Sequence, residues 1–297
     1  MGVTMDRSSR RALTRAGRPL TPQLHRRSGA LPGTRDPLPR DPTVAPVHPD
    51  SSATVAERVS LPEWQADPER WRGARAVVVD GAFADSTAVA TWTPQRLAAR
   101  FPSVAVEARH VRPEAWGDWS LVESEPTTVA RFVELLGTGA TAQILQQPIG
   151  PFPGLLEELN PGRMVDPPYT SVNLYLGRGT RTPLHYDWQE NLFVQVFGSK
   201  QFVLEPPDSP AGRYVHDGPS AHISRVDPRA PDPVRFPAYD PDRQRSVLLA
   251  AGDALYLPPG WFHDVTAPGT SISVNCWFGE FLGAEEEARY RAATTRP

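Results

Sequence analysis

Apolar and polar residues alternate in the second half of the chain, in the pattern expected for strands. Val172, Leu174 and Leu176 fall on one face of the first strand, and Asn173 and Tyr175 fall on the other. Further strands are predicted at residues 192–197, 200–204, 246–249, 254–257 and 270–278. Many short strands separated by Gly and Pro turns predict a mainly β fold, a barrel or a sandwich with helices at its edge.

Two connections between these strands stand out. Gly198-Ser199 separates two strands and predicts a type II′ hairpin. Residues 205–245 are rich in Pro and Asp, so we expect a long loop with little secondary structure. Substrate choice is expected to depend on this loop and on segments before Thr170, which contain no readable motif.

Signals for helices are concentrated before residue 170. Thr93 followed by Pro94 has the pattern of an N-cap and a first helical residue. Thr128 is expected to cap a second helix, which ends at Gly137. Short strands are predicted at residues 76–79, 104–106 and 142–146.

The chain divides into four parts by composition and pattern. Residues 1–57 are rich in Arg and Pro and lack apolar periodicity, so we expect a disordered tail. An N-terminal α/β segment that packs on the core is expected at residues 58–169, and a β barrel at residues 170–282. A terminal helix is expected at residues 283–297.

The composition excludes several classes of protein. Cys276 is the only cysteine among 297 residues, which excludes a disulfide framework and a Cys-based structural zinc site. No apolar run approaches the ~18 residues of a membrane span. The net charge of −3 gives no reason to expect nucleic-acid binding. We therefore expect a cytoplasmic protein.

Lys200 is the only lysine among 31 basic residues. The use of Arg elsewhere, together with frequent Ala and Pro, indicates a genome-wide bias of the kind expected in a bacterium. A lysine that persists under this bias is a candidate for a role that requires a lysine.

His185 and Asp187 carry the main chemical signal. Side chains two residues apart on a strand share a face, so this imidazole and this carboxylate can bind one ion together. They would supply two ligands of a 2-His-1-carboxylate triad, which leaves coordination positions open and suits non-haem Fe(II). The third ligand must come from elsewhere in the chain, and the histidines available outside the tail are His110, His216, His222 and His263.

The third ligand is assigned to His263. His216 and His222 lie in the Pro- and Asp-rich loop, where a rigid ligand is harder to hold, and His110 precedes the predicted barrel. His263 follows a predicted strand and a Pro-Pro-Gly corner, which together would deliver its imidazole to a fixed position.

Residues 182–207 and 252–278 resemble the JmjC and cupin-like hydroxylases related to the asparaginyl hydroxylase of hypoxia-inducible factor. The resemblance extends over residues 76–279 and implies a double-stranded β-helix (jelly-roll) core that uses Fe(II), 2-oxoglutarate and O₂. On the family pattern, His185, Asp187 and His263 fall on the iron ligands.

The same resemblance implies a 2-oxoglutarate site. Lys200 falls on the residue that pairs with the distal carboxylate of this cosubstrate, and Thr182 falls on a hydroxyl that assists it. Asn191 and Asn275 fall on amides near the other end of the cosubstrate. The sequence departs from the family at Ile144, where relatives have a tyrosine that also binds the distal carboxylate. The cosubstrate site is therefore expected to depend more on Lys200 and Thr182.

Candidates for substrate contacts are weaker. Trp188 directly follows a proposed metal ligand, so its ring is placed to face a substrate. Tyr175 and Gln189 are further candidates near the same site.

The resemblance implies a dioxygenase that hydroxylates a C–H bond of a peptide or protein side chain, with succinate and CO₂ as coproducts. A hydroxylase of a small amino-acid-derived metabolite in natural-product biosynthesis remains an alternative. So does a cupin-like metal-binding protein that is not catalytic or does not use 2-oxoglutarate. An N-methyl demethylase and a transfer-RNA-modifying enzyme are less favoured, because histone-reading modules are absent and the charge is acidic. The sequence predicts no oligomeric state.

Overall fold

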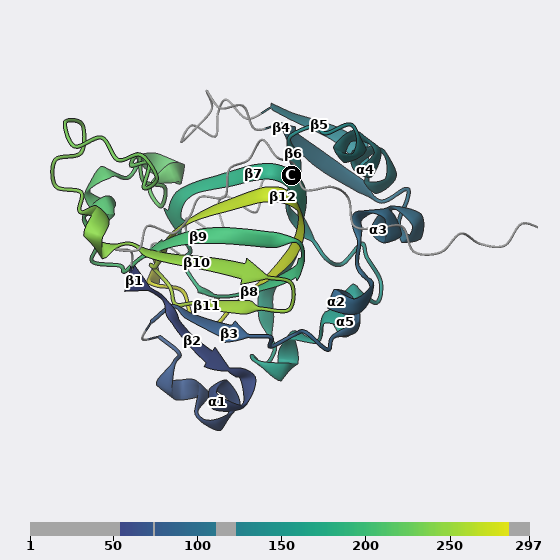
Figure 1. Ribbon diagram of the computed structural model, residues 1–297, viewed down its shortest axis with the longest axis horizontal. Helices are drawn as coiled ribbons and strands as arrows, with labels where there is room; N and C mark the ends of the chain where they lie inside the picture. Colours follow the sequence, from purple (N-terminus) through teal and green to yellow (C-terminus); the bar gives the residue numbers. More distant parts are fainter. Residues whose placement is uncertain (1–53, 74, 111–122, 285–297) are drawn as a thin grey trace, which may run out of the picture. The chain divides into compact units, whose positions relative to one another are not determined.

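The computed structural model describes residues 54–73, 75–110 and 123–284 (Figure 1). The predicted terminal helix at 283–297, apart from its first two residues, and most of the predicted tail lie outside these residues. The last residues of the predicted tail are not disordered, because β1 (Thr54–Val55) pairs in parallel with a strand of the barrel and β2 (Glu57–Ser60) follows it.

Two long antiparallel strands form the centre of the sheet. β7 (Tyr169–Tyr186) and β12 (Phe262–Phe278) pair along almost their whole length, and Figure 1 shows them side by side. The predicted alternation in β7 is confirmed, since Leu174 and Leu176 are buried in the main apolar cluster while Tyr175 faces a cavity.

The strands on either side of Gly198 do not form the predicted hairpin. β8 (Glu190–Phe197) and β9 (Ser199–Glu205) do not pair with each other, and both run antiparallel to β12, β9 beside its first half and β8 beside its second. They are therefore successive parts of one bent strand. Gly198 has a φ of +70° at the bend, and a Cβ there would collide with the Thr270 carbonyl oxygen.

A second bent strand follows the first. β10 (Arg245–Ala250) pairs with β9, and β11 (Ala254–Leu257) pairs with β8. Each long strand thus passes from one half of the barrel to the other, which gives the mainly β jelly-roll core that the sequence predicted. The connection between β9 and β10 has three short 3₁₀ helices and only isolated bridges, as expected for a long loop.

The N-terminal part adds strands to this sheet. β3 (Val77–Asp80) pairs with β11 and with β2, whereas β6 (Ala142–Pro148) pairs with β7. Beyond β6 the sheet continues through β4 (Ala105–His110) and β5 (Glu123–Thr128). Strands from before residue 170 therefore extend the sheet at both ends, and β4 to β6 reach the rim of the barrel (Figure 1).

The described α-helices, α1 to α5, span Leu61–Ala66, Thr87–Thr91, Pro94–Arg100, Val129–Gly137 and Leu155–Leu159. Short 3₁₀ helices occupy Pro68–Arg70, Pro161–Arg163, Pro210–Tyr214, Gly218–Ser220 and Pro241–Arg243. Both predicted caps are confirmed, since the Thr93 and Thr128 side chains accept hydrogen bonds from the third backbone N–H of α3 and α4. None of the described helices has the length and apolar character needed to cross a bilayer.

The two faces of the barrel strands bury different sets of side chains. Leu192 and Val194 of β8 belong to the main apolar cluster, which also contains buried residues of the helices. Phe193, between them, belongs to a second cluster with Phe202 and Leu257 inside the barrel. The period of two in each strand therefore separates a packed outer core from an interior whose apolar residues line a cavity.

Candidate metal centre

Three potential metal ligands meet at one end of the barrel. His185 lies at the end of β7, Asp187 directly follows it, and His263 lies at the start of β12. The pairing of β7 with β12 places His263 directly opposite His185. His185 and Asp187, two residues apart, thus lie beside His263, which follows Asp187 by 76 residues in the chain.

The ligand atoms are close enough to bind one ion. One ligand atom from each of the three residues lies within 4.8 Å of the other two. The His185 and His263 ring centroids are 4.1 Å apart, and His263 Nε2 is 3.7 Å from Asp187 Oδ2. Atoms about 2.0–2.2 Å from a common ion are at most about 4.4 Å apart, so a small inward movement allows all three to coordinate it.

Backbone carbonyls fix the tautomer of both histidines. His185 Nδ1 lies 2.7 Å from the Pro183 carbonyl oxygen, and His263 Nδ1 lies 3.0 Å from that of Trp261. A carbonyl oxygen only accepts, so each Nδ1 carries the proton and donates it. Each Nε2 therefore presents its lone pair, in the arrangement in which a second interaction orients a metal-binding imidazole.

Electrostatics favour the protonation states that bind metals. Burial opposes ionisation of Asp187, but the neighbouring His263 and His185 and the hydrogen bond from Asn191 outweigh it and lower its pKa. Burial, reinforced by the neighbouring His185, lowers the pKa of His263. An ionised carboxylate and a neutral imidazole are the forms that coordinate a cation.

A cavity of about 330 Å³ adjoins the three residues. Its size is that of a small-molecule site, for which about 300–1,000 Å³ is usual. Lys200 lies inside it, where Nζ donates to Ser273 Oγ at 2.9 Å and lies about 5 Å from the ring centroids of Tyr175 and Phe193. Burial lowers the pKa of Lys200 to about 7.

Lys200 has no acidic partner among the described residues. A buried ammonium without a counter-ion is unfavourable, and a ligand carboxylate would supply the missing charge. Thr182, Asn191 and Asn275 line the same cavity. Asn191 Nδ2 donates to Asp187 Oδ2 at 2.7 Å, while its Oδ1 is buried without a hydrogen-bond partner in the described chain. The residues present therefore fit both a metal ion and a carboxylate ligand.

A model of the cupin-like domain matches residues 72–283. The chain belongs to the cupin-like domain family. The jelly-roll core of the described residues is consistent with this membership.

Three relatives of this cupin-like protein have names that refer to a JmjC domain or to an activity. It is 38% identical over 114 residues to Jumonji C domain-containing protein 5 of Drosophila melanogaster, covering 38% of this chain and 28% of that protein. It is 34% identical over 139 residues to human bifunctional peptidase and (3S)-lysyl hydroxylase JMJD7, covering 39% and 43%. It is 31% identical over 110 residues to human tRNA wybutosine-synthesizing protein 5, covering 37% and 34%. The matches span less than half of each relative, and all three are eukaryotic, which does not support the expected bacterial source.

The structure changes the interpretation of Ile144. Its side chain is buried in the main apolar cluster and does not line the cavity, whereas Leu145 and Gln146 do. The pairing of β6 with β7 shifts after Ile144, which changes the face on which the following side chains lie. Tyr175 provides a phenol inside the cavity instead, hydrogen-bonded to Gln146 and Asn275.

The other substrate candidates lie beside the metal centre. Trp188 and Gln189 line a smaller hollow of about 60 Å³ that shares His185 and Asp187 with the main cavity. Gln189 Nε2 donates to Thr170 Oγ1 at 2.9 Å and to the Gly279 carbonyl oxygen at 2.8 Å, so this amide ties two chain segments together. Substrate contact by Trp188, Tyr175 and Gln189 stays a prediction.

His222 lies closer to the centre than the sequence indicated. Its ring centroid is 6.4 Å from that of His185 and 4.5 Å from that of Trp188. Two backbone hydrogen bonds hold this part of the loop beside β7: the Tyr186 N–H donates to the His222 carbonyl oxygen at 3.1 Å, and the Ser224 N–H donates to that of Leu184 at 2.8 Å. The ligand cluster of the described residues nevertheless contains His263 and not His222. No periodic pattern in the sequence predicts these bonds or the position of Arg109 at the cavity.

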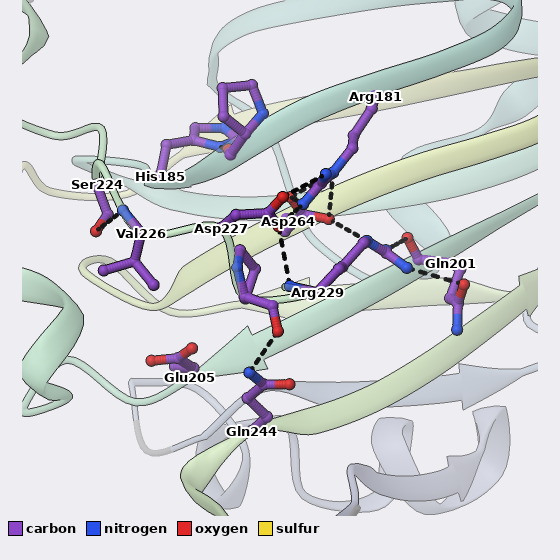
Figure 2. A network of polar contacts seen from close by, with 12 residues as sticks. Arg181, His185, Gln201, Glu205, Ser224, Val226, Asp227, Arg229, Gln244 and Asp264 are labelled. Atoms are coloured by element: carbon purple, nitrogen blue, oxygen red, sulfur yellow. Dashed lines mark hydrogen bonds and ion pairs between the residues drawn. The ribbon is translucent and has the colours of Figure 1, made fainter. Parts of the chain in front are cut away.

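A charged network fixes this loop to the barrel (Figure 2). Asp264, the neighbour of His263, is fully buried and accepts hydrogen bonds from Arg181 Nε at 3.0 Å and Arg229 Nε at 2.7 Å. Arg181 also forms an ion pair with Asp227 of the loop. The network thus links β7, β12 and the loop next to the residues that meet at the metal centre.

Proposed function

We propose that this protein is an Fe(II)- and 2-oxoglutarate-dependent oxygenase that hydroxylates a C–H bond of a peptide or protein side chain. The observation that carries the proposal is a buried ammonium, Lys200, in the same cavity as two imidazoles and one carboxylate. This combination provides one site for a metal ion and a separate site for a carboxylate.

His185, Asp187 and His263 are assigned as the iron ligands. Two imidazoles and one carboxylate leave coordination positions open for a cosubstrate. When bound, the iron with 2-oxoglutarate and O₂ supplies the oxidising chemistry, with succinate and CO₂ as coproducts. The carbonyls of Pro183 and Trp261 hold the imidazoles in the required tautomer, and Asn191 orients the carboxylate.

The remaining cavity residues are assigned to the cosubstrate. Lys200 neutralises the distal carboxylate, and Thr182 donates a hydroxyl hydrogen bond to it. Asn191 and Asn275 provide amides for the other end. Apolar side chains of the second cluster line the cavity near Lys200, exclude water and strengthen this charge pair.

The names of two relatives support an oxygenase reaction of this class. The human relative JMJD7 is called a lysyl hydroxylase, and a Xenopus tropicalis relative, 31% identical over 110 residues, is called lysine-specific demethylase 8. The particular likeness to an asparaginyl hydroxylase stays a prediction, as does the cytoplasmic location.

An anaerobic titration tests the proposal. Fe(II)-loaded protein titrated with 2-oxoglutarate is expected to develop the weak visible charge-transfer band of a chelated cosubstrate. The band should be lost in His185→Ala together with iron binding, whereas Lys200→Ala should keep iron and require far more 2-oxoglutarate. Bound iron without a band at any 2-oxoglutarate concentration would contradict the proposal and favour a cupin that does not use this cosubstrate.

A further inference from the structure

The charged residues of the cavity are mainly basic. Among the described residues that line it, Asp187 is the only acidic one, and it is assigned to the metal. Lys200 and Arg109 are the two residues with basic side chains other than histidine. Away from the metal centre, the described lining therefore attracts anions and repels cations.

Arg109 reaches the cavity from outside the barrel. It lies on β4, two strands beyond β7, and the pairing of β4 with β5 places it opposite Ser124, another lining residue. The Ser124 hydroxyl donates to Glu107 Oε2 at 2.7 Å, so the exposed Glu107 carboxylate on the same face of β4 already has a partner. Arg109 is half-buried and lies within electrostatic range of Tyr175.

Arg109 itself has no ion pair and no hydrogen bond from its guanidinium within the described chain, unlike its neighbour His110, which contacts Glu125 at 3.2 Å. A half-buried guanidinium that faces a cavity without an anion is available to a ligand. Lys200, held by Ser273 within the barrel, already supplies the charge that the cosubstrate needs.

We propose that Arg109 selects a substrate that carries a carboxylate close to the carbon that is hydroxylated. This inference rests on the proposed function and names its substrate class. One guanidinium matches one carboxylate in charge and in its two-pronged geometry, whereas a doubly charged phosphate would require further cations that the described lining does not offer. The carboxylate belongs either to an Asp or Glu side chain of a peptide or to a free acidic amino acid.

This substrate class differs from the one named for the lysyl hydroxylase relative. A lysine side chain would enter a cavity in which Arg109 repels it and no described acidic residue outside the metal centre pairs with it. The charge of the lining therefore argues against lysine as the substrate of this chain.

Binding measurements with matched probes test the inference. One arm uses peptides of a single sequence that differ only at the central residue, which is Asp, Glu, Asn, Gln or Lys. The other arm uses free aspartate, glutamate, asparagine and lysine. Calorimetry measures binding to Mn(II)-loaded protein with 2-oxoglutarate, and mass spectrometry of the Fe(II) enzyme detects the added oxygen. We expect the acidic member to bind best in the arm that contains the natural source.

Substitutions at Arg109 connect this preference to the residue. Arg109→Gln should weaken binding of the acidic probe about tenfold to a hundredfold, as expected for loss of a charge-assisted hydrogen bond. Arg109→Lys should retain part of the preference, and Arg109→Glu should reverse it in favour of the Lys probe. Arg131→Gln removes the same charge from the exposed surface of α4 and should change nothing.

Three outcomes overturn the inference: a wild-type preference for Lys, no binding in either arm, or an Arg109→Gln variant that loses affinity for 2-oxoglutarate instead of for the acidic probe. The last result would place Arg109 in the cosubstrate site. The proposed function fails separately, because it requires the 2-oxoglutarate charge-transfer band and does not depend on the charge of the substrate.

Discussion

Replacement of Lys200 by Met should make the ligand-free protein more stable while removing its affinity for 2-oxoglutarate. Lys200 is buried, and its contacts are a hydroxyl and two aromatic rings instead of a carboxylate. Burial lowers its pKa from 10.5 to about 7. Met has a similar length and no charge, so Lys200→Met removes the unfavourable burial of the ammonium and keeps most of the packing.

The size of the effect follows from the pKa. The pKa of Lys200 falls by roughly 3.5, and at about 1.4 kcal/mol for each pKa unit this corresponds to about 5 kcal/mol of lost stability at neutral pH. The variant leaves the Ser273 hydroxyl without its partner, which costs about 1–3 kcal/mol. The net stabilisation is therefore about 2–4 kcal/mol, or about 5–15 °C in Tm for a chain of this size.

The difference in unfolding free energy between Lys200→Met and the wild type should depend on pH. Below pH 7 the lysine is protonated in both the folded and the unfolded wild type, so the full difference is present. Between pH 7 and 10.5 the unfolded chain binds the proton that folded Lys200 has released, so the stability of the wild type rises with pH. The advantage of Lys200→Met should decrease across this range and disappear near its upper end.

Urea or thermal unfolding of both proteins from pH 6 to pH 10 measures this dependence, with Arg131→Met as an exposed control that should gain nothing. Added Mn(II) should stabilise both proteins by mass action, whereas 2-oxoglutarate added with Mn(II) should stabilise the wild type further and give Lys200→Met no additional stability. A variant that is less stable than the wild type at pH 6–7 would refute the reasoning, because the ammonium would then be stabilised by its surroundings.

Two further predictions concern the framework around the site. Asp264→Asn should destabilise the protein by about 2–3 kcal/mol in urea unfolding, since it leaves Arg181 and Arg229 without the buried charge that joins them. Asp217→Asn, which affects only an exposed ion pair, should cost less than about 1 kcal/mol, and equal effects would contradict the role given to burial. Gly198→Ala should destabilise the protein by more than about 1 kcal/mol, because Gly198 has a positive φ and the added Cβ would contact the Thr270 carbonyl oxygen. Gly269→Ala, whose Cβ would meet open space, should be nearly neutral. A similar cost for both variants would be inconsistent with the bend at Gly198.

Features that depend on neighbouring residues could be predicted from the sequence. His185 and Asp187 share a face because strand geometry relates residues two apart, and Thr93 and Thr128 cap helices through local bonds. The choice of His263 used the Pro-Pro-Gly corner before it, and β12 does begin after that corner.

Features that depend on strand pairing could not be predicted. Gly198 suits a hairpin and a bend equally, since both use a positive φ, and only the path of β12 decides between them. The register shift after Ile144 places Gln146 in the cavity without any mark in the local pattern. Arg109 reaches the cavity because β4 extends the sheet beyond β6, and His222 because backbone bonds hold an aperiodic loop.

The protein uses its single lysine where an arginine would serve poorly. A guanidinium stays charged at any accessible pH, so an Arg at residue 200 would be a permanent unpaired cation inside the ligand-free barrel. An ammonium whose pKa has fallen to about 7 is partly neutral while the cavity holds no anion. A bound carboxylate would favour the charged form again, since an opposite charge nearby raises the pKa of a lysine. Lys200 thus reduces the free-energy cost of the ligand-free cavity, whereas the guanidinium of Arg109 has a smaller desolvation cost because this residue is only half-buried on β4.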